Sequence, residues 1–276
     1  MWNIICDSGC DLFKLETGSE NICYRTVPFY LTINNMDFPD DENLDIAEMV
    51  GIMKESRKAS SSACPSPESW RHEMVENEKN ICITVSKNLS GSYQSADLAV
   101  KAVMEDSPQT EAAVVDGCAT GPASVLVVRK IVELIEKGVA FKDVINEASE
   151  YAKGINTVFA LSCFDNLVKS GRISKVAGMI ATSLGFWGVG AEEDGRIAFK
   201  AKVRGKKKAI STMLDIIKEN GFVSKEVVIS HCLNEPLAIK MKEEIENIDN
   251  SINVTIFNTR GLNSFYADEE GLIISY

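Results

Sequence analysis

Histidine and closely spaced cysteine pairs are scarce in this chain of 276 residues. It has only two histidines, His72 and His231, and no Cys-x-x-Cys pair among its eight cysteines. The usual spacing of zinc ligands is therefore missing. Cys6 and Cys82 fall within short apolar runs and are expected to be reduced, buried thiols. We expect no metal and no cofactor.

Basic residues are outnumbered by acidic ones, with 29 Lys and Arg against 40 Asp and Glu and a formal net charge of -11. Such a chain has no overall attraction to nucleic acid or to an anionic membrane. No apolar run approaches membrane-spanning length, and Asp7 interrupts the first apolar run too early for a signal sequence. We expect a cytoplasmic protein with no nucleic-acid partner and no membrane span.

Short apolar runs alternate with longer amphipathic segments, a pattern typical of α/β proteins. The first half predicts strands at 3–6, 81–85 and 112–115 and a crossover helix at 123–135. The second half predicts strands at 157–161, 227–229, 252–257 and 272–275, helices at 175–183, 206–220 and 235–245, and a hairpin of 186–191 and 196–203 turned by Asp194-Gly195. A boundary near Gly154 gives two α/β domains, 1–155 and 156–276, with a cleft between them.

The turn Leu89-Ser90-Gly91-Ser92 separates an apolar strand from an amphipathic helix. The first backbone N–H groups of a helix lack partners and attract an anion, and small residues let that anion approach. The alternative is that Ser90 or Ser92 simply caps the helix. The turn matches neither the Gly-x-Ser-x-Gly motif of hydrolases nor a nucleotide-binding P-loop.

The segment 60–67 is rich in serine and contains Pro65 and Pro67, which prevent a regular helix. Its serines, Ser62 among them, offer hydrogen-bond donors in an extended conformation. The alternative, which we favour from these residues alone, is a capping turn before a helix that starts near Glu68.

Asp7, Asp116 and Arg172 are further candidates for a site. Both aspartates end apolar runs, where a carboxylate can bind a metal or activate a substrate, although such aspartates more often cap a helix or organise a loop. Arg172 lies in a glycine-containing turn before a helix and is the best-placed group to hold an anion. A single arginine is otherwise an ordinary solvated side chain.

Taken together, these segments resemble the DegV family of bacterial fatty-acid-binding proteins. The matching blocks run in order through 5–12, 27–29, 62–67, 89–96, 115–116, 167–174 and 204–209. The resemblance implies two α/β domains that enclose an acyl chain in an apolar tunnel at their interface.

The family pattern also implies roles for individual residues. Hydroxyls of Ser62 and Ser90 would hold the fatty-acid carboxylate, with the Gly91 and Ser92 backbone close by, and Arg172 would lie near the head group and a partner surface. The partner implied is a fatty acid kinase that phosphorylates the bound acid. The chain would present substrate rather than catalyse, and its sequence contains no ATP site.

The last block departs from the family pattern. Where members have His-x-Gly-Pro-Gly, this chain reads Tyr266-Ala267-Asp268-Glu269-Glu270-Gly271. We expect the Tyr266 phenol to replace the histidine as a donor to the carboxylate. The added carboxylates would repel a bound acid unless they point away from it.

Two alternatives differ in class from a fatty-acid carrier. One is an enzyme that acts on a small acid or a phosphorylated metabolite in the interdomain cleft with Asp7, Asp116 and Arg172. The other is a divergent regulatory module whose tunnel is partly filled, for example by Trp187, and which mainly binds another protein.

Overall fold

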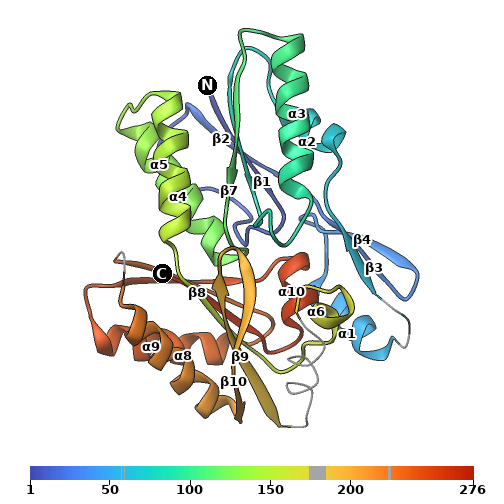
Figure 1. Ribbon diagram of the computed structural model, residues 1–276, viewed down its shortest axis with the longest axis vertical. Helices are drawn as coiled ribbons and strands as arrows, with labels where there is room; N and C mark the ends of the chain where they lie inside the picture. The colour runs from blue at the N-terminus through green and yellow to red at the C-terminus, as the bar shows by residue number, and fades with distance from the viewer. Residues whose placement is uncertain (57, 59, 174–184, 223–224) are drawn as a thin grey trace.

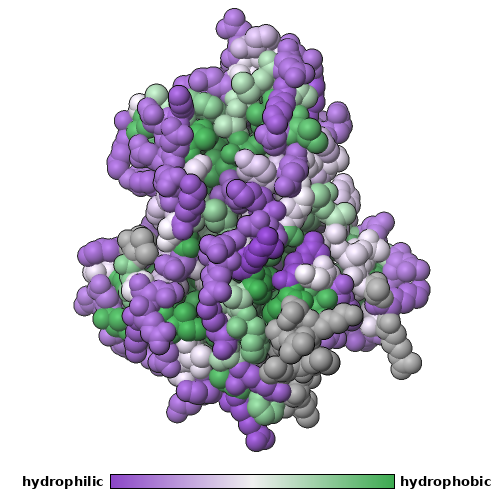
Figure 2. Space-filling model, viewed as in Figure 1, coloured by the Kyte–Doolittle hydropathy of each residue, from purple (hydrophilic) through white to green (hydrophobic). Residues whose placement is uncertain are grey.

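The structure is a computed structural model that describes residues 1–56, 58, 60–173, 185–222 and 225–276 (Figure 1). It contains parallel and mixed sheets covered by helices, so the predicted α/β class is confirmed. Hydrophilic side chains cover most of the outer surface on the face drawn in Figure 2. No helix in the described part of the chain is long and apolar enough to span a membrane.

The first sheet is entirely parallel and has the order β2-β1-β6-β7. Its strands are β1 (Trp2–Asp7), β2 (Ile22–Val27), β6 (Lys79–Thr84) and β7 (Glu111–Asp116). The helices α2 (Pro67–Glu73) and α3 (Ser92–Asp106) cover one face, and α4 (Pro122–Glu136) and α5 (Phe141–Gly154) cover the other (Figure 1). Helices on both faces explain why every residue of β1 is buried.

The second sheet is mixed and has the order β10-β9-β8-β13-β11-β12. Its strands are β8 (Thr157–Leu161), β9 (Phe186–Glu193), β10 (Arg196–Arg204), β11 (Glu226–His231), β12 (Asn253–Asn258) and β13 (Leu272–Ser275). The helices α8 (Lys206–Asn220) and α9 (Glu235–Ile248) pack on one face in a common core. The other face is turned toward the rest of the molecule, where α4 contacts both β11 and β13 as well as β6 of the first sheet.

A third, small sheet of order β4-β3-β5 was not predicted. It consists of β3 (Tyr30–Ile33), β4 (Met36–Pro39) and β5 (Ser61–Ala63), and α1 (Ile46–Glu55) lies between β4 and β5 in the chain. Side chains from this region, such as Leu31 and Met49, share a buried cluster with Leu161 and Phe265 from the second half, which also contributes α6 (Asp165–Lys169) and α10 (Gly261–Ala267). This part of the first half therefore packs with the second half. The predicted division into two domains at residue 155 stays a prediction.

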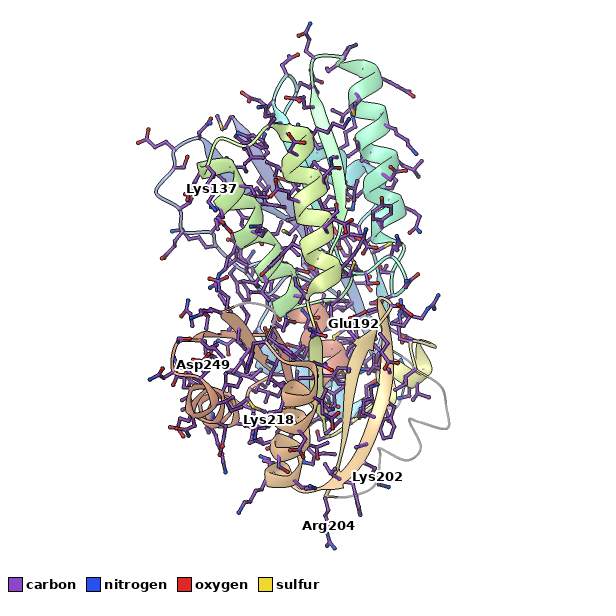
Figure 3. All side chains as sticks on the ribbon, turned by 60° about the vertical axis from the view of Figure 1, so that its left-hand side comes forward. Lys137, Glu192, Lys202, Arg204, Lys218 and Asp249 are labelled. Atoms are coloured by element: carbon purple, nitrogen blue, oxygen red, sulfur yellow. The ribbon has the colours of Figure 1, made fainter. Side chains whose placement is uncertain are left out.

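The predicted hairpin is confirmed and connects the two halves. Asp194 and Gly195 both have positive φ, 51° and 72°, as a two-residue turn of this kind requires. At its tip, the Ser86 hydroxyl donates to the Gly195 carbonyl over 2.7 Å, and the Asn88 side-chain amide donates to the Asp194 carbonyl over 2.7 Å. Figure 3 shows Glu192 near this tip and Arg204 at the opposite end of the hairpin. The tip therefore anchors the second sheet to the loop after β6.

The remaining predicted helices and strands are found near their expected positions, except that the helix predicted at 175–183 lies outside the described residues. In the segment 60–67, the capping turn belongs to Ser66, whose hydroxyl accepts from the Ser69 N–H over 3.1 Å at the start of α2. Ser62 instead lies in β5 and pairs with Leu31. The serine-rich segment thus contains both a strand and a cap.

Candidate functional site

A largely apolar cavity lies between the inner face of the second sheet and the loops of the first half. Thr157, Phe159 and Leu161 of β8 line it, as expected for alternate residues on one face of a strand. Of the predicted site residues, Ser62, Ser90, Arg172 and Tyr266 line the same cavity. The other lining residues are Phe29, Val85, Leu89, Ala119, Thr120, Leu167, Glu192, Arg196, Ile197, Leu262, Asn263, Ala267 and Ile273.

Ser62, Tyr266 and Arg172 form one group of polar side chains in this cavity. The Ser62 and Tyr266 hydroxyls are 2.8 Å apart, and the Arg172 guanidinium lies 5.6 Å from the centre of the Tyr266 ring. Arg172 Nε donates to the Leu89 carbonyl over 3.3 Å, and Nη1 donates to the Ser170 carbonyl over 3.2 Å. These contacts hold a cation beside two hydroxyls, a set of groups suited to bind a carboxylate.

Ser90 joins this group from the turn after β6. Its hydroxyl oxygen accepts from the Ser92 N–H over 3.2 Å, which leaves the hydroxyl proton able to donate to a ligand. The N-cap position of α3 is Gly91, so neither serine occupies it, although the Ser90 hydroxyl does pair with the N–H of the first helical residue, Ser92. Neither Gly91 nor Ser92 is among the residues that line the cavity.

Ser92 and Asp7 support the turn from behind. The buried Ser92 hydroxyl donates to Asp7 Oδ2 over 2.6 Å, and the same oxygen accepts from the Val85 N–H over 3.0 Å. Asp7 Oδ1 accepts from the Gly9 N–H over 3.1 Å. Burial raises the pKa of Asp7 to about 6. Asp7 thus fixes the turn and lies outside the cavity lining.

Asp116 also organises a loop. Its Oδ1 accepts from the backbone N–H groups of Lys87 and Cys118, and its Oδ2 lies 3.5 Å from Lys87 Nζ. Like Asp7, it is not among the cavity-lining residues. The enzyme hypothesis therefore keeps only Arg172 of its three residues in the cavity.

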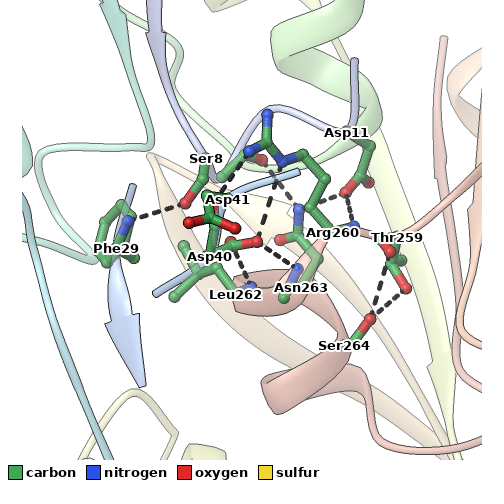
Figure 4. A network of polar contacts seen from close by, with 12 residues as sticks. Ser8, Asp11, Phe29, Asp40, Asp41, Thr259, Arg260, Leu262, Asn263 and Ser264 are labelled. Atoms are coloured by element: carbon green, nitrogen blue, oxygen red, sulfur yellow. Dashed lines mark hydrogen bonds and ion pairs between the residues drawn. The ribbon is translucent and has the colours of Figure 1, made fainter. Parts of the chain in front are cut away.

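The helix α10, which carries Tyr266, is held by a buried polar network (Figure 4). The Asp40 carboxylate accepts from the Gly261 and Leu262 N–H groups, each over 2.7 Å, at the start of that helix. Arg260 Nη2 donates to the Asp40 carbonyl over 2.9 Å. Sequence reasoning missed Asp40 and Arg260, which are separated by 220 residues and belong to no recognisable motif.

A second set of bonds attaches α10 to the first half of the chain. Asp11 Oδ1 accepts from the Arg260 N–H and from Asn263 Nδ2, each over 2.8 Å. The Thr120 hydroxyl donates to Asn263 Oδ1 over 2.7 Å. With the Asp40 contacts, these bonds fix the position of α10 and hence of Tyr266 beside Ser62.

Comparison with known proteins identifies the family. A family model described as "Uncharacterised protein, DegV family" matches residues 1–267. The chain belongs to the DegV family. Among curated relatives, a DegV domain-containing protein of Streptococcus pyogenes serotype M18 is 35% identical over 276 residues, which cover 100% of this chain and 99% of the relative.

Solved DegV structures agree closely with the whole chain. The Streptococcus pneumoniae Fatty Acid Kinase (Fak) B3 protein loaded with linoleic acid superposes with a TM-score of 0.95 at 35% identity, covering 100% of this chain and 98% of that one. A DegV family protein from Eubacterium eligens loaded with heptadecanoic acid has a TM-score of 0.94 at 28% identity, covering 100% and 99%. The two-domain DegV fold expected from the sequence is confirmed.

The acidic run that departs from the DegV pattern points away from the cavity. Glu269 forms an ion pair with Lys54, and Glu270 forms one with Lys206. The Asp268 carboxylate accepts from the Glu269 N–H over 2.6 Å. None of the three acidic residues lines the cavity. These three residues therefore add no carboxylate to the cavity lining, whose one acidic residue in the described part of the chain is Glu192 of β9.

Trp187 does not fill the cavity of this DegV protein. It is buried in the core between the second sheet and α8, with Ile210 and Met213 in the same cluster, and is not a lining residue. Trp187 therefore gives no support to the hypothesis of a regulatory module with a partly filled tunnel. No group of three or more possible metal ligands occurs among the described residues.

Proposed function

We propose that this chain binds a long-chain fatty acid in the cavity and presents its carboxylate to a partner kinase. The observation that carries this proposal is the grouping of Ser62, Ser90, Arg172 and Tyr266 within an otherwise largely apolar cavity. The bond between the Ser62 and Tyr266 hydroxyls opens when the acid binds, so that both hydroxyls and that of Ser90 donate to the carboxylate, and Arg172 lies beside it. The chain itself carries out no catalysis.

Physical chemistry supports an acyl tail as the other part of the ligand. Each methylene removed from water contributes about 0.8 kcal/mol, so a long tail dominates the affinity and the polar group sets the orientation. The two fatty-acid-loaded DegV structures, at 35% and 28% identity, support the same ligand class.

A second, open hollow supports presentation to a phosphate donor. It is lined by Arg172 and Arg196 together with Asn88, Leu89, Ser170, Gly171, Ile173 and Ile197. Arg172 borders both the cavity and this hollow. A partner that delivers a phosphoryl group through the hollow meets two guanidinium groups in its path, and guanidinium groups pair well with phosphate. The likeness to the Fak B3 protein supports a fatty acid kinase as that partner. The same proposal places the chain in the cytoplasm.

Native mass spectrometry of the protein purified from a bacterial host tests fatty-acid binding. We expect a retained mass of fatty-acid size, or its appearance after palmitate or oleate is added. Absence of bound acid after both additions contradicts the proposal. Acyl phosphate formation with ATP and a streptococcal fatty acid kinase, captured as the hydroxamate, tests presentation. If the loaded protein yields no hydroxamate, fatty-acid binding stands and presentation to the kinase is contradicted.

A further inference from the structure

The strand β9 has glycines at two alternate positions on the face that is turned toward the cavity. Gly188 lies opposite Leu161 of β8, and Gly190 lies opposite Phe159. Neither glycine lines the cavity, although Leu161 and Phe159 both do. Glycine weakens a strand unless another group comes close to the backbone. We therefore expect another group to lie close to the backbone at Gly188 and Gly190.

Aromatic rings occupy the space above both glycines. A Cβ built on Gly190 would lie 2.3 Å from Phe159 Cζ, and one built on Gly188 would lie 2.5 Å from Phe164 Cε2. Real Cβ atoms do not approach other atoms so closely. The Phe159 ring thus rests directly on the Gly190 backbone, an arrangement also known to stabilise glycine in a sheet.

The Phe159 ring borders the cavity on one side. Gly190 lies beneath it, and Phe164 lies beside it with 6.4 Å between the ring centres. Phe159 is itself a lining residue of the cavity. The cavity therefore offers space for a ring that is displaced from Gly190.

Phe159 stands midway along the cavity wall formed by β8. Leu161 and Thr157 line the cavity on either side of it, about 13 Å apart at roughly 3.3 Å per residue. Leu161 is next to Ser162, whose hydroxyl donates to the Glu269 carbonyl, three residues after Tyr266. A long acyl tail that spans this wall must pass Phe159, and more of a long tail than of a short one lies beyond the ring.

We propose that Gly190 and Phe159 determine the length of acyl chain that the cavity accepts, because the bare glycine backbone gives the ring a place outside the path of the tail. The inference rests on the proposed fatty-acid binding and deepens it. It assigns a specificity-determining role to two residues that do not touch the carboxylate.

Two variants that displace the ring in different ways test the inference. Gly190→Ala pushes the ring from below, and Phe159→Trp introduces a ring too large for the space above Gly190. For each variant, dissociation constants for palmitate and for decanoate are measured by isothermal titration calorimetry. We expect the affinity for palmitate to fall at least about tenfold more than that for decanoate, since the longer tail has more apolar contacts to lose beyond Phe159.

Rescue and control variants separate this effect from a general loss of structure. Phe159→Leu, combined with Gly190→Ala, removes the ring and is expected to restore palmitate binding. Gly154→Ala is the matched control, because a Cβ there meets nothing within 4 Å. A Cβ on Gly190 also lies 2.7 Å from the Ala198 carbonyl oxygen and strains the hairpin. Phe159→Trp leaves that backbone unchanged.

The outcomes distinguish this inference from the proposed function. If wild-type protein binds neither acid, the proposed function and the inference that rests on it are both overturned. If wild-type protein binds palmitate and both variants leave the palmitate-to-decanoate ratio unchanged, fatty-acid binding stands and the inference is overturned. Equal weakening of both acids in folded Phe159→Trp also overturns it, since the ring is then only structural.

Discussion

The Ser62 and Tyr266 hydroxyls lie 2.8 Å apart although 204 residues separate them in the chain. One hydroxyl comes from β5 of the small third sheet, and the other comes from α10 near the C-terminus. Arg172 stacks near the Tyr266 ring from a third segment. Three parts of the chain therefore meet at the polar part of an apolar cavity, and each of them can be tested separately.

Ser62→Ala combined with Ser90→Ala is expected to weaken fatty-acid binding strongly. Each substitution removes one hydrogen bond to a carboxylate, and such a bond is worth about 1.5–3 kcal/mol. Displacement of a fluorescent fatty acid measures the change. Ser61→Ala is the matched control, because Ser61 is exposed on the same strand and is not a lining residue. A double variant that binds as tightly as wild type shows that the serines do not hold the carboxylate.

Tyr266→Phe isolates the phenol from the ring. The ring that contacts Arg172 and packs edge-on against Phe265 is kept, and only the hydroxyl is lost. Removal of one neutral hydrogen bond is expected to lower the affinity for palmitate about three- to tenfold. Tyr30→Phe, at an exposed tyrosine outside the cavity, is the control. Unchanged palmitate affinity in Tyr266→Phe would mean that the phenol does not replace the family histidine.

The sequence predicted the fold well where its signals are local. Periodic apolar runs and the Asp194-Gly195 turn gave the main strands, helices and hairpin, because such patterns act over a few residues. It also named four residues that line the cavity, through ordered family blocks. The sequence favours a turn where the structure has β5, since three residues of serine and alanine carry no alternating apolar pattern.

Long-range polar contacts were beyond the reach of sequence reasoning. Asp40 lies next to Asp41 and Glu42 in an acidic segment that is typical of an exposed loop, yet it is buried and caps a helix that starts at Gly261. Gly190 likewise gives no signal of its own in an apolar strand. Both roles depend on which distant segment packs against the residue, and no local pattern encodes that.

Asp40→Asn is expected to destabilise the protein and to weaken ligand binding through α10. The carboxylate accepts from two N–H groups, Gly261 and Leu262, and asparagine has only one acceptor oxygen and places a donor against the other N–H. We expect a loss of about 1–3 kcal/mol in the free energy of unfolding, measured with urea. Asp215→Asn, at an exposed position on α8, is the control. A change below about 0.5 kcal/mol contradicts the capping role of Asp40.

The buried Asp11 is expected to make the stability of the folded protein depend on pH. Burial raises its pKa from 3.8 to about 6. The nearby Ser230 hydroxyl offsets part of this shift without forming a hydrogen bond of ordinary geometry, and Asp11 Oδ2 has no partner among the described residues. Because the pKa is higher in the folded state, that state binds the proton more tightly. The contribution of Asp11 to stability is therefore complete below pH 3.8, falls as the pH rises, and is lost above about pH 6.

Asp11→Asn removes this titration and keeps an acceptor oxygen for the Arg260 N–H and for Asn263. The free energy of unfolding of wild type minus that of the variant is expected to fall by up to about 3 kcal/mol between about pH 4 and about pH 7, measured with urea. For Asp249→Asn, the same difference in unfolding free energy is expected to rise with pH instead. The hydrogen bond from the Ser251 hydroxyl lowers the pKa of the exposed Asp249, so this residue stabilises the protein less as the pH falls. A wild-type-minus-Asp11→Asn difference that stays constant across this range would show that the buried carboxylate has an ordinary pKa, and that the network around α10 solvates its charge as well as water does.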